Sequence, residues 1–305
     1  THGTPTIIPP IPVADPSVPV EDLEVQVVST GEYAAVRQAG VAALRVVAVG
    51  HTTPGHVSTI PLASAPTDID LAPNGSRIYA MERDAKKLAV VDIPSLAVAT
   101  VDLSDAAVGS IVLSADGTRA LSFTNATLDP RITSIDLVHP GFPHTTWPLK
   151  KGVRAVLLSP NSASALVVNA KEPGDPATAS SVDEYIARSY GYTVLDLASG
   201  FGKLQLTPVD AASYAYALDG SKAYVALDGG DADTAVRGLQ IITIQTGVVV
   251  TKALGSPPSS VGVLPGIGAA FTAQRHPLGR ISFVDITTDA MRTVTGFDLN
   301  SHVVN

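Results

Sequence analysis

The sequence predicts an all-β chain in which one unit of four short antiparallel strands is repeated six times. The clearest copy spans residues 66–103 and reads PTDIDLAPNGSRIYAMERDAKKLAVVDIPSLAVATVDL. It contains an alternating strand, an Asn-Gly turn, a second strand, a polar loop, a third strand ending in Val-Val-Asp-Ile, a turn and a fourth strand. The position of the first turn returns in five more copies, and the aspartate of the third strand returns in three more.

Four short antiparallel strands that recur about every 40 to 50 residues indicate the blade of a β-propeller. The register is marked by Gly75 in the first turn, and successive marks lie 44, 42, 45, 58 and 46 residues apart. The marks in the other copies are Gly31, Gly117, Ser162, Gly220 and Gly266. Asn-Gly and Asp-Gly at these places are typical of hairpin turns, because both residue types tolerate positive φ. We therefore expect six blades, and a seventh would have to come from sequence outside this chain.

An aspartate occupies one register of four expected third strands: Asp92, Asp136, Asp196 and Asp285. One interpretation is a ring of metal or substrate ligands. The preferred interpretation is that each carboxylate closes the turn into the fourth strand through an Asx-type hydrogen bond.

Several copies resemble the YVTN family of β-propeller repeats, whose pattern is roughly an S-P-D-G turn, a Tyr-Val strand and a Val-Ile-Asp strand. The segments that carry the resemblance are LAPNGSRIYAM with LAVVDIPS, LSADGTRALSF with ITSIDLVH, and LDGSKAYVALD. The resemblance covers residues 22–299 and implies the propeller architecture. Propellers of this kind include surface proteins, lactonase-like enzymes and docking modules, so the resemblance does not select one function.

Composition excludes several classes of protein. Hydrophobic residues make up 45% of the 305 residues and charged residues 16%, which suits extensive buried sheet and excludes general disorder. The net charge of -8 argues against a nucleic-acid groove. The absence of cysteine excludes disulfides, thiolate zinc sites and cysteine nucleophiles. No apolar run reaches the roughly 18 residues of a membrane-spanning helix.

Three regions are expected along the chain. Residues 1–21 are rich in proline and are interpreted as a linker or stalk, residues 22–300 as the propeller, and residues 301–305 as a tail. The linker-like start suggests an exported bacterial protein that is secreted, periplasmic or on the cell surface. The absence of cysteine fits an exported and a cytosolic protein equally.

One face of a propeller carries the loops between second and third strands together with the crossings between blades, and ligands usually bind there. The longest such loop is residues 171–190 of the fourth repeat, KEPGDPATASSVDEYIARSY. A capping box that begins at Ser181 predicts a short helix over 182–189. Tyr185 and Ile186 would lie on its apolar-aromatic side. This segment is interpreted as a lid or partner-recognition finger, or as a helix that packs on its own blades.

Two further loops carry candidate ligands. In DGGDADTAVR, Asp228, Asp231 and Asp233 could offer oxygen ligands to calcium, although the closing glutamate of a calcium hand is missing and a solvated acidic loop is the alternative. No other cofactor is expected. The loop QRHPLG places Arg275 and His276 beside the channel, where His276 is a candidate catalytic base.

The mouth of the channel is predicted at the starts of the inner strands, where small or polar residues recur: Glu24, Asp68, Ser110, Arg154, Ser213 and Ser259. A lactonase-like hydrolase with a divalent ion would need several converging carboxylates, asparagines or histidines. Only Glu24, Asp68 and Asp70 qualify, with Arg154 or His276 assisting.

Other motifs are weak. The pairs His51 with His56 and His139 with His144 are interpreted as solvated turn histidines, the alternative being an intermolecular metal contact. Trp147 is the only tryptophan, which excludes the Trp-Asp class of propellers, and no G-x-S-x-G serine motif is present.

The function that these observations favour is a non-enzymatic binding or structural propeller of the bacterial envelope or cell surface. It would present its long-loop face to a protein partner or assembly. The alternative is the lactonase-like hydrolase at the channel mouth.

Overall fold

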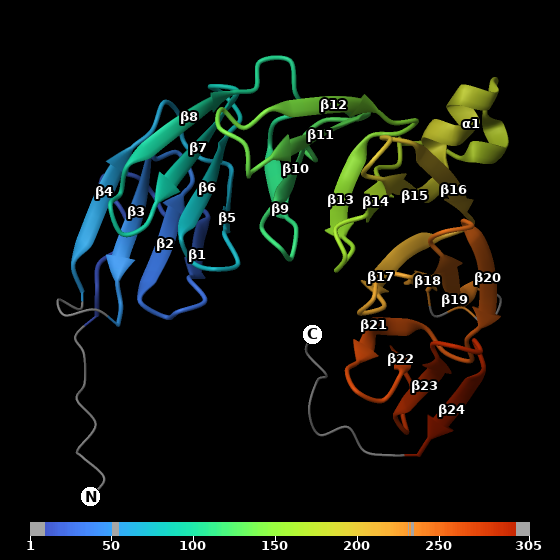
Figure 1. Ribbon diagram of the computed structural model, residues 1–305. Helices are drawn as coiled ribbons and strands as arrows, with labels where there is room; N and C mark the ends of the chain where they lie inside the picture. The colour runs from blue at the N-terminus through green and yellow to red at the C-terminus, as the bar shows by residue number, and fades with distance from the viewer. Residues whose placement is uncertain (1–9, 51–54, 231, 233–234, 297–305) are drawn as a thin grey trace, which may run out of the picture. The chain divides into compact units, whose positions relative to one another are not determined.

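The computed structural model describes residues 10–50, 55–230, 232 and 235–296 of the chain. Two compact units divide it, Thr1–Leu113 and Ser114–Asn305, and each is described by itself. In chain order, each run of four strands forms one antiparallel sheet in which neighbours in sequence are also neighbours in the sheet: β1–β4, β5–β8, β9–β12, β13–β16, β17–β20 and β21–β24, called sheets 1 to 6 (Figure 1). The predicted number and composition of the repeats is confirmed.

Unit 1 contains the strands of sheets 1 and 2 and the first strand of sheet 3. They are β1 (Leu23–Val27), β2 (Tyr33–Gln38), β3 (Ala43–Ala48), β4 (Val57–Pro61), β5 (Asp68–Leu71), β6 (Arg77–Glu82), β7 (Lys87–Asp92), β8 (Val98–Asp102) and β9 (Ser110–Leu113).

Unit 2 contains the remaining strands and two short helices. The strands are β10 (Arg119–Phe123), β11 (Arg131–Asp136), β12 (His144–Pro148), β13 (Val153–Leu158), β14 (Ser164–Asn169), β15 (Tyr190–Asp196), β16 (Gly202–Thr207), β17 (Asp210–Tyr216), β18 (Lys222–Asp228), β19 (Arg237–Thr243), β20 (Val248–Ala253), β21 (Pro258–Leu264), β22 (Ala269–Gln274), β23 (Arg280–Asp285) and β24 (Met291–Thr295). The helices are the 3-10 turn η1 (Pro176–Thr178) and α1 (Val182–Arg188). No helix among the described residues is long and apolar enough to cross a membrane.

The hairpin between the first two strands of each sheet has the predicted turn chemistry. All six register marks have positive φ, from 56° at Ser162 to 83° at Gly266. In four of the turns the preceding Asn or Asp accepts a hydrogen bond from the backbone N–H two residues on, as Asn74 does from Ser76 at 3.0 Å and Asp219 does from Ser221 at 2.9 Å. The local sequence therefore stabilises the reversal of the chain.

The repeated aspartate of the third strand closes the following turn in three of its four positions. The Oδ1 atom of Asp136 accepts the Val138 N–H at 2.8 Å, and Asp285 Oδ1 accepts the Thr287 N–H at 3.0 Å. Asp196 Oδ1 accepts the Ser199 N–H at 2.7 Å. The preferred interpretation is confirmed at these residues, whereas Asp92 accepts a hydrogen bond from Arg77 Nε at 2.8 Å.

The hydrophobic core lies between facing sheets. In unit 1, one cluster joins Leu44 and Val46 of sheet 1 to Ile69 and Ile78 of sheet 2. In unit 2, a second cluster joins sheets 4 and 5 and a third joins sheets 5 and 6. Both faces of the central strands are covered, so nearly every residue of β6 and β14 is buried.

The described part of the expected linker packs against sheet 1. Ile11 and Val13 lie against a cluster formed by Ala34, Val36 and Val47. Arg45 Nη1 donates to the Val13 carbonyl at 2.6 Å. These contacts fix at least part of residues 10–21 on the β2–β3 face of unit 1.

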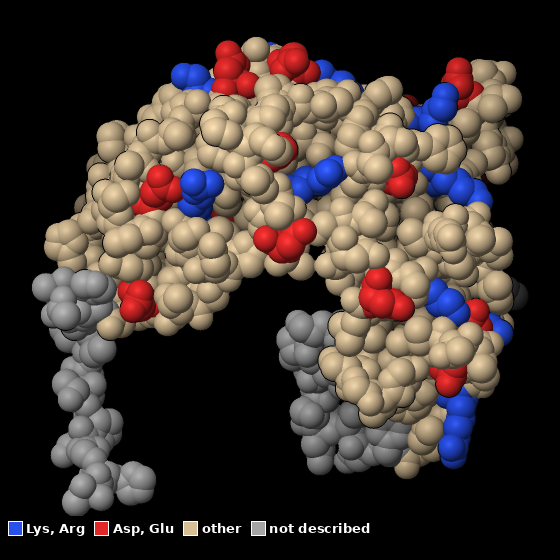
Figure 2. All heavy atoms as spheres, in the orientation of Figure 1, with Lys and Arg blue, Asp and Glu red and all other residues tan. Residues whose placement is uncertain are grey.

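Basic side chains do not gather into a patch on the face drawn in Figure 2. Among the described residues there, Lys and Arg lie singly or in small groups, several of them beside Asp or Glu side chains.

Candidate functional site

The predicted mouth residues of unit 1 connect the first strands of neighbouring sheets. Asp68 Oδ2 accepts the Ile111 N–H at 2.9 Å, and Asp70 Oδ2 accepts the Leu113 N–H at 2.9 Å. Ser110 is the first residue of β9, beside these bonds. Two carboxylates of β5 thus serve as acceptors for the backbone of β9.

Glu24 is held by a neighbouring cation. Arg37 Nε lies 2.5 Å from Glu24 Oε2, and the same guanidinium lies 2.9 Å from Asp22. Gln26 donates from Nε2 to Glu24 Oε1 and to the Ile69 carbonyl, each at 2.7 Å. The Gln26 amide therefore links β1 to β5 in the way that Asp68 and Asp70 link β5 to β9.

Burial and neighbouring charge act on the carboxylates of β5. Burial, together with the carboxylates of Glu24 and Asp70, raises the pKa of Asp68 to about 6, although the Ile111 N–H and Arg37 oppose the shift. Burial also raises the pKa of Asp70. Glu24, Asp68 and Asp70 interact electrostatically, but these three described carboxylates do not form a metal-binding group.

The predicted mouth residues of unit 2 also lie on first strands. Arg154 of β13 makes a bidentate ion pair with Asp210, with both N···O distances 2.7 Å. Ser213 Oγ of β17 accepts the Val261 N–H at 3.0 Å. Ser259 is exposed in β21.

The loops at the ends of β18 and β22 meet through an ion pair. Arg275 Nη2 lies 2.9 Å from Asp228 Oδ2, while Asp228 Oδ1 accepts the Gly230 N–H at 2.8 Å. His276 Nδ1 accepts the Leu278 N–H at 3.2 Å, which closes its own turn.

The predicted calcium ligands are only partly visible, because Asp231 and Asp233 lie outside the described residues. Among the residues that the structure describes, no group of three or more Asp, Glu and His side chains has a metal-binding arrangement. Calcium at this loop stays a prediction.

The long loop of sheet 4 carries the predicted helix. Ser181 is the N-cap of α1, and its hydroxyl accepts the Glu184 N–H at 3.1 Å. Glu184 reaches back to the N–H of Ser180 at 2.6 Å rather than to that of the N-cap residue. The helix ends at Arg188, one residue before the predicted end.

A buried lysine fixes α1 to its sheet. Lys151, which is 4% exposed, donates from Nζ to the carbonyl oxygens of Ile186 at 2.5 Å and Ala187 at 2.7 Å. These carbonyls belong to the end of the helix, which favours a cation. Burial lowers the pKa of Lys151.

Two apolar residues of α1 are accessible to solvent, on either side of the exposed Asp183 in the sequence. Val182 is 74% exposed and Tyr185 is 48% exposed, whereas Ile186 is half-buried. No residue of the helix is buried. The sequence placed Tyr185 on the apolar-aromatic side of the helix and left open whether that side packs on its own blades; it did not single out Val182.

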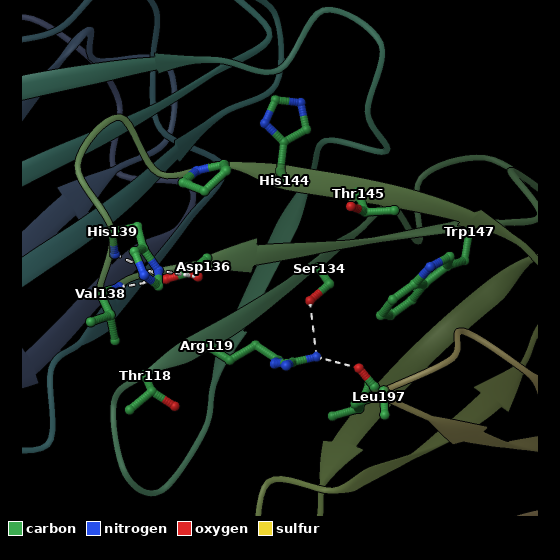
Figure 3. A pocket seen from close by; sticks show the side chains of 12 residues that line it. Thr118, Arg119, Ser134, Asp136, Val138, His139, His144, Thr145, Trp147 and Leu197 are labelled. Atoms are coloured by element: carbon green, nitrogen blue, oxygen red, sulfur yellow. Dashed lines mark hydrogen bonds and ion pairs between the residues drawn. The ribbon is translucent and has the colours of Figure 1, made fainter.

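Sequence reasoning missed a cleft of about 460 Å³ in unit 2, between sheets 3 and 4 (Figure 3). Sheet 3 provides most of its lining, and Leu197 and Ala198 of sheet 4 close it: Thr118, Arg119, Ser134, Asp136, Val138, His139, Pro143, His144, Thr145, Trp147, Leu197 and Ala198. We call it the Trp147 cleft. The single tryptophan and the basic residue at the start of β10 were the available signals.

Comparisons with known proteins identify the fold of this chain but do not assign it to a sequence family. No protein-family model matches the sequence, and no curated protein matches it in sequence. The resemblance to YVTN repeats therefore stays a prediction.

Solved structures are similar in fold. Hydrazine synthase of Kuenenia stuttgartiensis matches with a TM-score of 0.53 and 15% identity over 86% of this chain and 76% of that chain. Dihydro-heme d1 dehydrogenase NirN in complex with DHE matches with a TM-score of 0.52 and 11% identity over 89% of this chain and 56% of that chain. Both are β-propeller proteins, and at such identities the likeness shows the fold alone. The chain therefore has the β-propeller fold, and its described residues form six four-stranded antiparallel blades.

Proposed function

We propose that this chain is a non-enzymatic binding propeller that docks a protein partner through the outward side of α1. The observation that carries the proposal is that two apolar side chains of α1, Val182 and Tyr185, are exposed to solvent. The helix that bears them is fixed to its sheet by the hydrogen bonds from Lys151. Exposed aromatic side chains that are fixed in advance suit partner binding, because little conformational entropy remains to be lost.

The local chemistry also supports recognition of a protein rather than catalysis. Each carboxylate predicted for the channel mouth already accepts hydrogen bonds from Arg37, Gln26 or backbone N–H groups. Through these hydrogen bonds, Glu24, Asp68 and Asp70 connect neighbouring strands, which gives each carboxylate a structural role. A lactonase-like hydrolase would need the same oxygens to bind a metal ion.

We further propose that the protein acts at the envelope or cell surface of a bacterium. The proline-rich composition of residues 1–21 supports a tether, although part of this segment packs on sheet 1. A net charge of -8 favours a protein partner over nucleic acid.

The test is a double substitution, Val182→Asp with Tyr185→Asp, compared with Leu218→Asp as a matched control. Leu218 is 58% exposed on a hairpin turn of sheet 5. The double variant should lose affinity for the partner captured from native cells by about 30-fold or more, as expected for an aromatic hot spot. Circular dichroism should stay unchanged in both variants. Equal capture by the double variant and the control would remove α1 from the binding surface.

A further inference from the structure

The Trp147 cleft is built by one face of sheet 3. Ser134 lies opposite Thr145, and Ile132 lies opposite Trp147, so Ser134, Thr145 and Trp147 project to the same side of the sheet. Arg119 lies opposite Asp136 and joins this side from β10. His144 occupies the alternate position, and Figure 3 shows its ring on the other side of β12 from Arg119.

Arg119 lines the cleft and bridges its two sheets. Its Nη1 atom donates to the Leu197 carbonyl of sheet 4 at 2.5 Å and lies 3.5 Å from Ser134 Oγ (Figure 3). Within the described part of the chain, neither Nε nor Nη2 has a hydrogen-bond partner, and no carboxylate pairs with the guanidinium. Arginine presents five donors in a planar fork, so a carboxylate-binding edge remains available.

The one carboxylate that lines the cleft is already satisfied. Asp136 accepts the backbone N–H groups of Val138 and His139, and His139 Nδ1 lies 2.7 Å from Asp136 Oδ2. The hydrogen bonds from His139 and Val138 lower the pKa of Asp136 to about 2. The cleft is therefore lined by one carboxylate, Asp136, whose oxygens already accept hydrogen bonds, and by one guanidinium, Arg119, whose Nε and Nη2 atoms have no partner among the described residues.

Equivalent residues in the other repeats show that this arrangement is unusual within the chain. Lys222 occupies the position of Arg119 in sheet 5 and likewise donates to a carbonyl of the next sheet, Ile286, at 2.7 Å. Its charge is neutralised by Asp289 at 2.6 Å. In sheet 2 the equivalent Arg77 pairs with Asp92 at 2.8 Å. A link between sheets 3 and 4 accounts for the hydrogen bond that Arg119 Nη1 donates to Leu197. It does not account for the Nε and Nη2 atoms, which have no partner among the described residues.

Trp147 supplies a planar wall. A Cβ atom on Gly200 would lie 2.4 Å from the Trp147 Nε1 atom, so the indole packs directly on the glycine of the next turn. The ring is half-buried and lines the cleft with Val138 and Leu197. A volume of about 460 Å³ falls in the range of small-molecule sites.

We propose that the Trp147 cleft binds a small aromatic carboxylate, with the carboxylate on the free edge of Arg119 and the ring stacked on Trp147. The site is separate from α1 and does not depend on the partner proposed above. The ion pair gives the preference for an anion, and the indole gives the preference for a planar body.

The only tryptophan of the chain is a built-in reporter for this site. We would titrate the protein with 4-nitrobenzoate, whose nitro group quenches indole fluorescence, and with the neutral 4-nitrobenzamide as a matched ligand. The carboxylate should quench saturably and bind at least about 10-fold more tightly than the amide, as a charge-assisted pair predicts. Ligand-detected NMR provides a second readout that does not depend on fluorescence.

Arg119→Gln should weaken binding of 4-nitrobenzoate by about 10-fold or more and leave the affinity for the amide unchanged. Arg131→Gln is the control, because Arg131 lies at the far end of β11 and pairs with Asp129 at 2.7 Å. Circular dichroism establishes that each variant is folded, and the comparison of the two ligands on the unsubstituted protein stands even if Arg119→Gln unfolds. Equal affinity for acid and amide, equal loss in both variants, or no saturable binding up to about 10 mM would overturn the proposal.

Discussion

Asp68 shows how a single carboxylate can look like a site in the sequence and act as a link in the structure. It lies at the start of an inner strand, where the sequence makes it a candidate metal ligand, and it accepts the Ile111 N–H at 2.9 Å. Its raised pKa has a structural cause, because the carboxylate is largely buried near Glu24 and Asp70. A perturbed pKa is therefore compatible with a structural role here.

Replacing Asp68 by asparagine should remove a pH dependence of stability. The folded-state pKa of about 6 lies above the ordinary value of 3.8, so the contribution of Asp68 to stability is greatest below pH 4 and is lost as the pH rises through about 6. Wild-type protein should lose about 3 kcal/mol of unfolding free energy from this group between low and neutral pH. Asparagine can still accept the Ile111 N–H.

Urea unfolding at pH 5 and pH 7.5 measures this effect. Asp68→Asn should flatten the difference, with a residual slope from Asp70, whose pKa is also raised. Asp84→Asn, at an exposed residue of the turn after β6, is the control and should keep the wild-type slope. Identical slopes in all three proteins would refute the assignment.

Residue-level prediction from the sequence succeeded where the signal was local. The cap at Ser181 and the Asx-type bonds of Asp136, Asp196 and Asp285 depend on neighbours within a few residues. Arg119 and Trp147 were missed because their proximity to Leu197 and Gly200 depends on how two sheets pack. No local pattern encodes that contact.

The hairpin turns are the elements in which backbone conformation and contact between sheets can be separated. Gly31 and Gly220 hold the same register, with φ of 73° and 70°. A Cβ on Gly31 would meet nothing within 4 Å, whereas a Cβ on Gly220 would lie 2.5 Å from the side chain of Asn161. Asn161 Nδ2 also donates to the Asp219 carbonyl at 2.9 Å, which joins the turns of sheets 4 and 5.

Gly31→Ala should therefore cost about 1 kcal/mol of unfolding free energy, through the positive φ alone. Gly220→Ala should cost at least about 1 kcal/mol more, because the Asn161 side chain must move and its hydrogen bond is strained. Chemical denaturation of both variants measures the two values. Equal destabilisation would mean that the turns of sheets 4 and 5 do not depend on each other.

Residues 10–21 make contacts that composition alone did not predict. Proline-rich composition indicated a linker, but Ile11 and Val13 pack on sheet 1, and Arg45 donates to the Val13 carbonyl. Composition predicts the conformation of an isolated segment. In the folded chain, the apolar face of β2 and β3 buries Ile11 and Val13 and so fixes the segment in place.

At the scale of the whole molecule, the repeat spacing was sufficient to predict six four-stranded sheets, because each repeat contains a complete antiparallel unit. The repeat spacing could not predict how the long loop between β14 and β15, which contains α1, is positioned on its sheet. The helix α1 owes its position to Lys151, which precedes β13 and lies 35 residues from Ile186. That contact forms only once the strands of sheet 4 are paired.

The turn carboxylates should make the molecule sensitive to strong acid. Hydrogen bonds from Ser114 and Thr118 lower the pKa of Asp116 to about 2, and the bonds from His139 and Val138 do the same for Asp136. A lowered folded-state pKa means that the contribution is present above about pH 4 and is lost as the pH falls towards 2. Asp68 acts in the opposite direction at higher pH.

Urea midpoints measured from pH 7.5 to pH 2.5 should therefore pass through a maximum near about pH 4 to 5. The double variant Asp136→Asn with Asp285→Asn should lose less stability on the acid side, because the pKa of both carboxylates is lowered by their turns. A midpoint that keeps rising down to pH 2.5 would contradict this account of the repeated turns.

The most direct test of the central claim is photo-crosslinking in native cells. A photoreactive phenylalanine analogue would be placed at Tyr185 on α1 and, separately, at Leu218 on the hairpin turn, which are 48% and 58% exposed. A docking propeller predicts that one and the same protein is captured from Tyr185 and not from Leu218, and that Lys151→Met weakens this capture by freeing the helix. Equal capture at both positions, or none at Tyr185, would contradict the assignment of α1 as the docking surface.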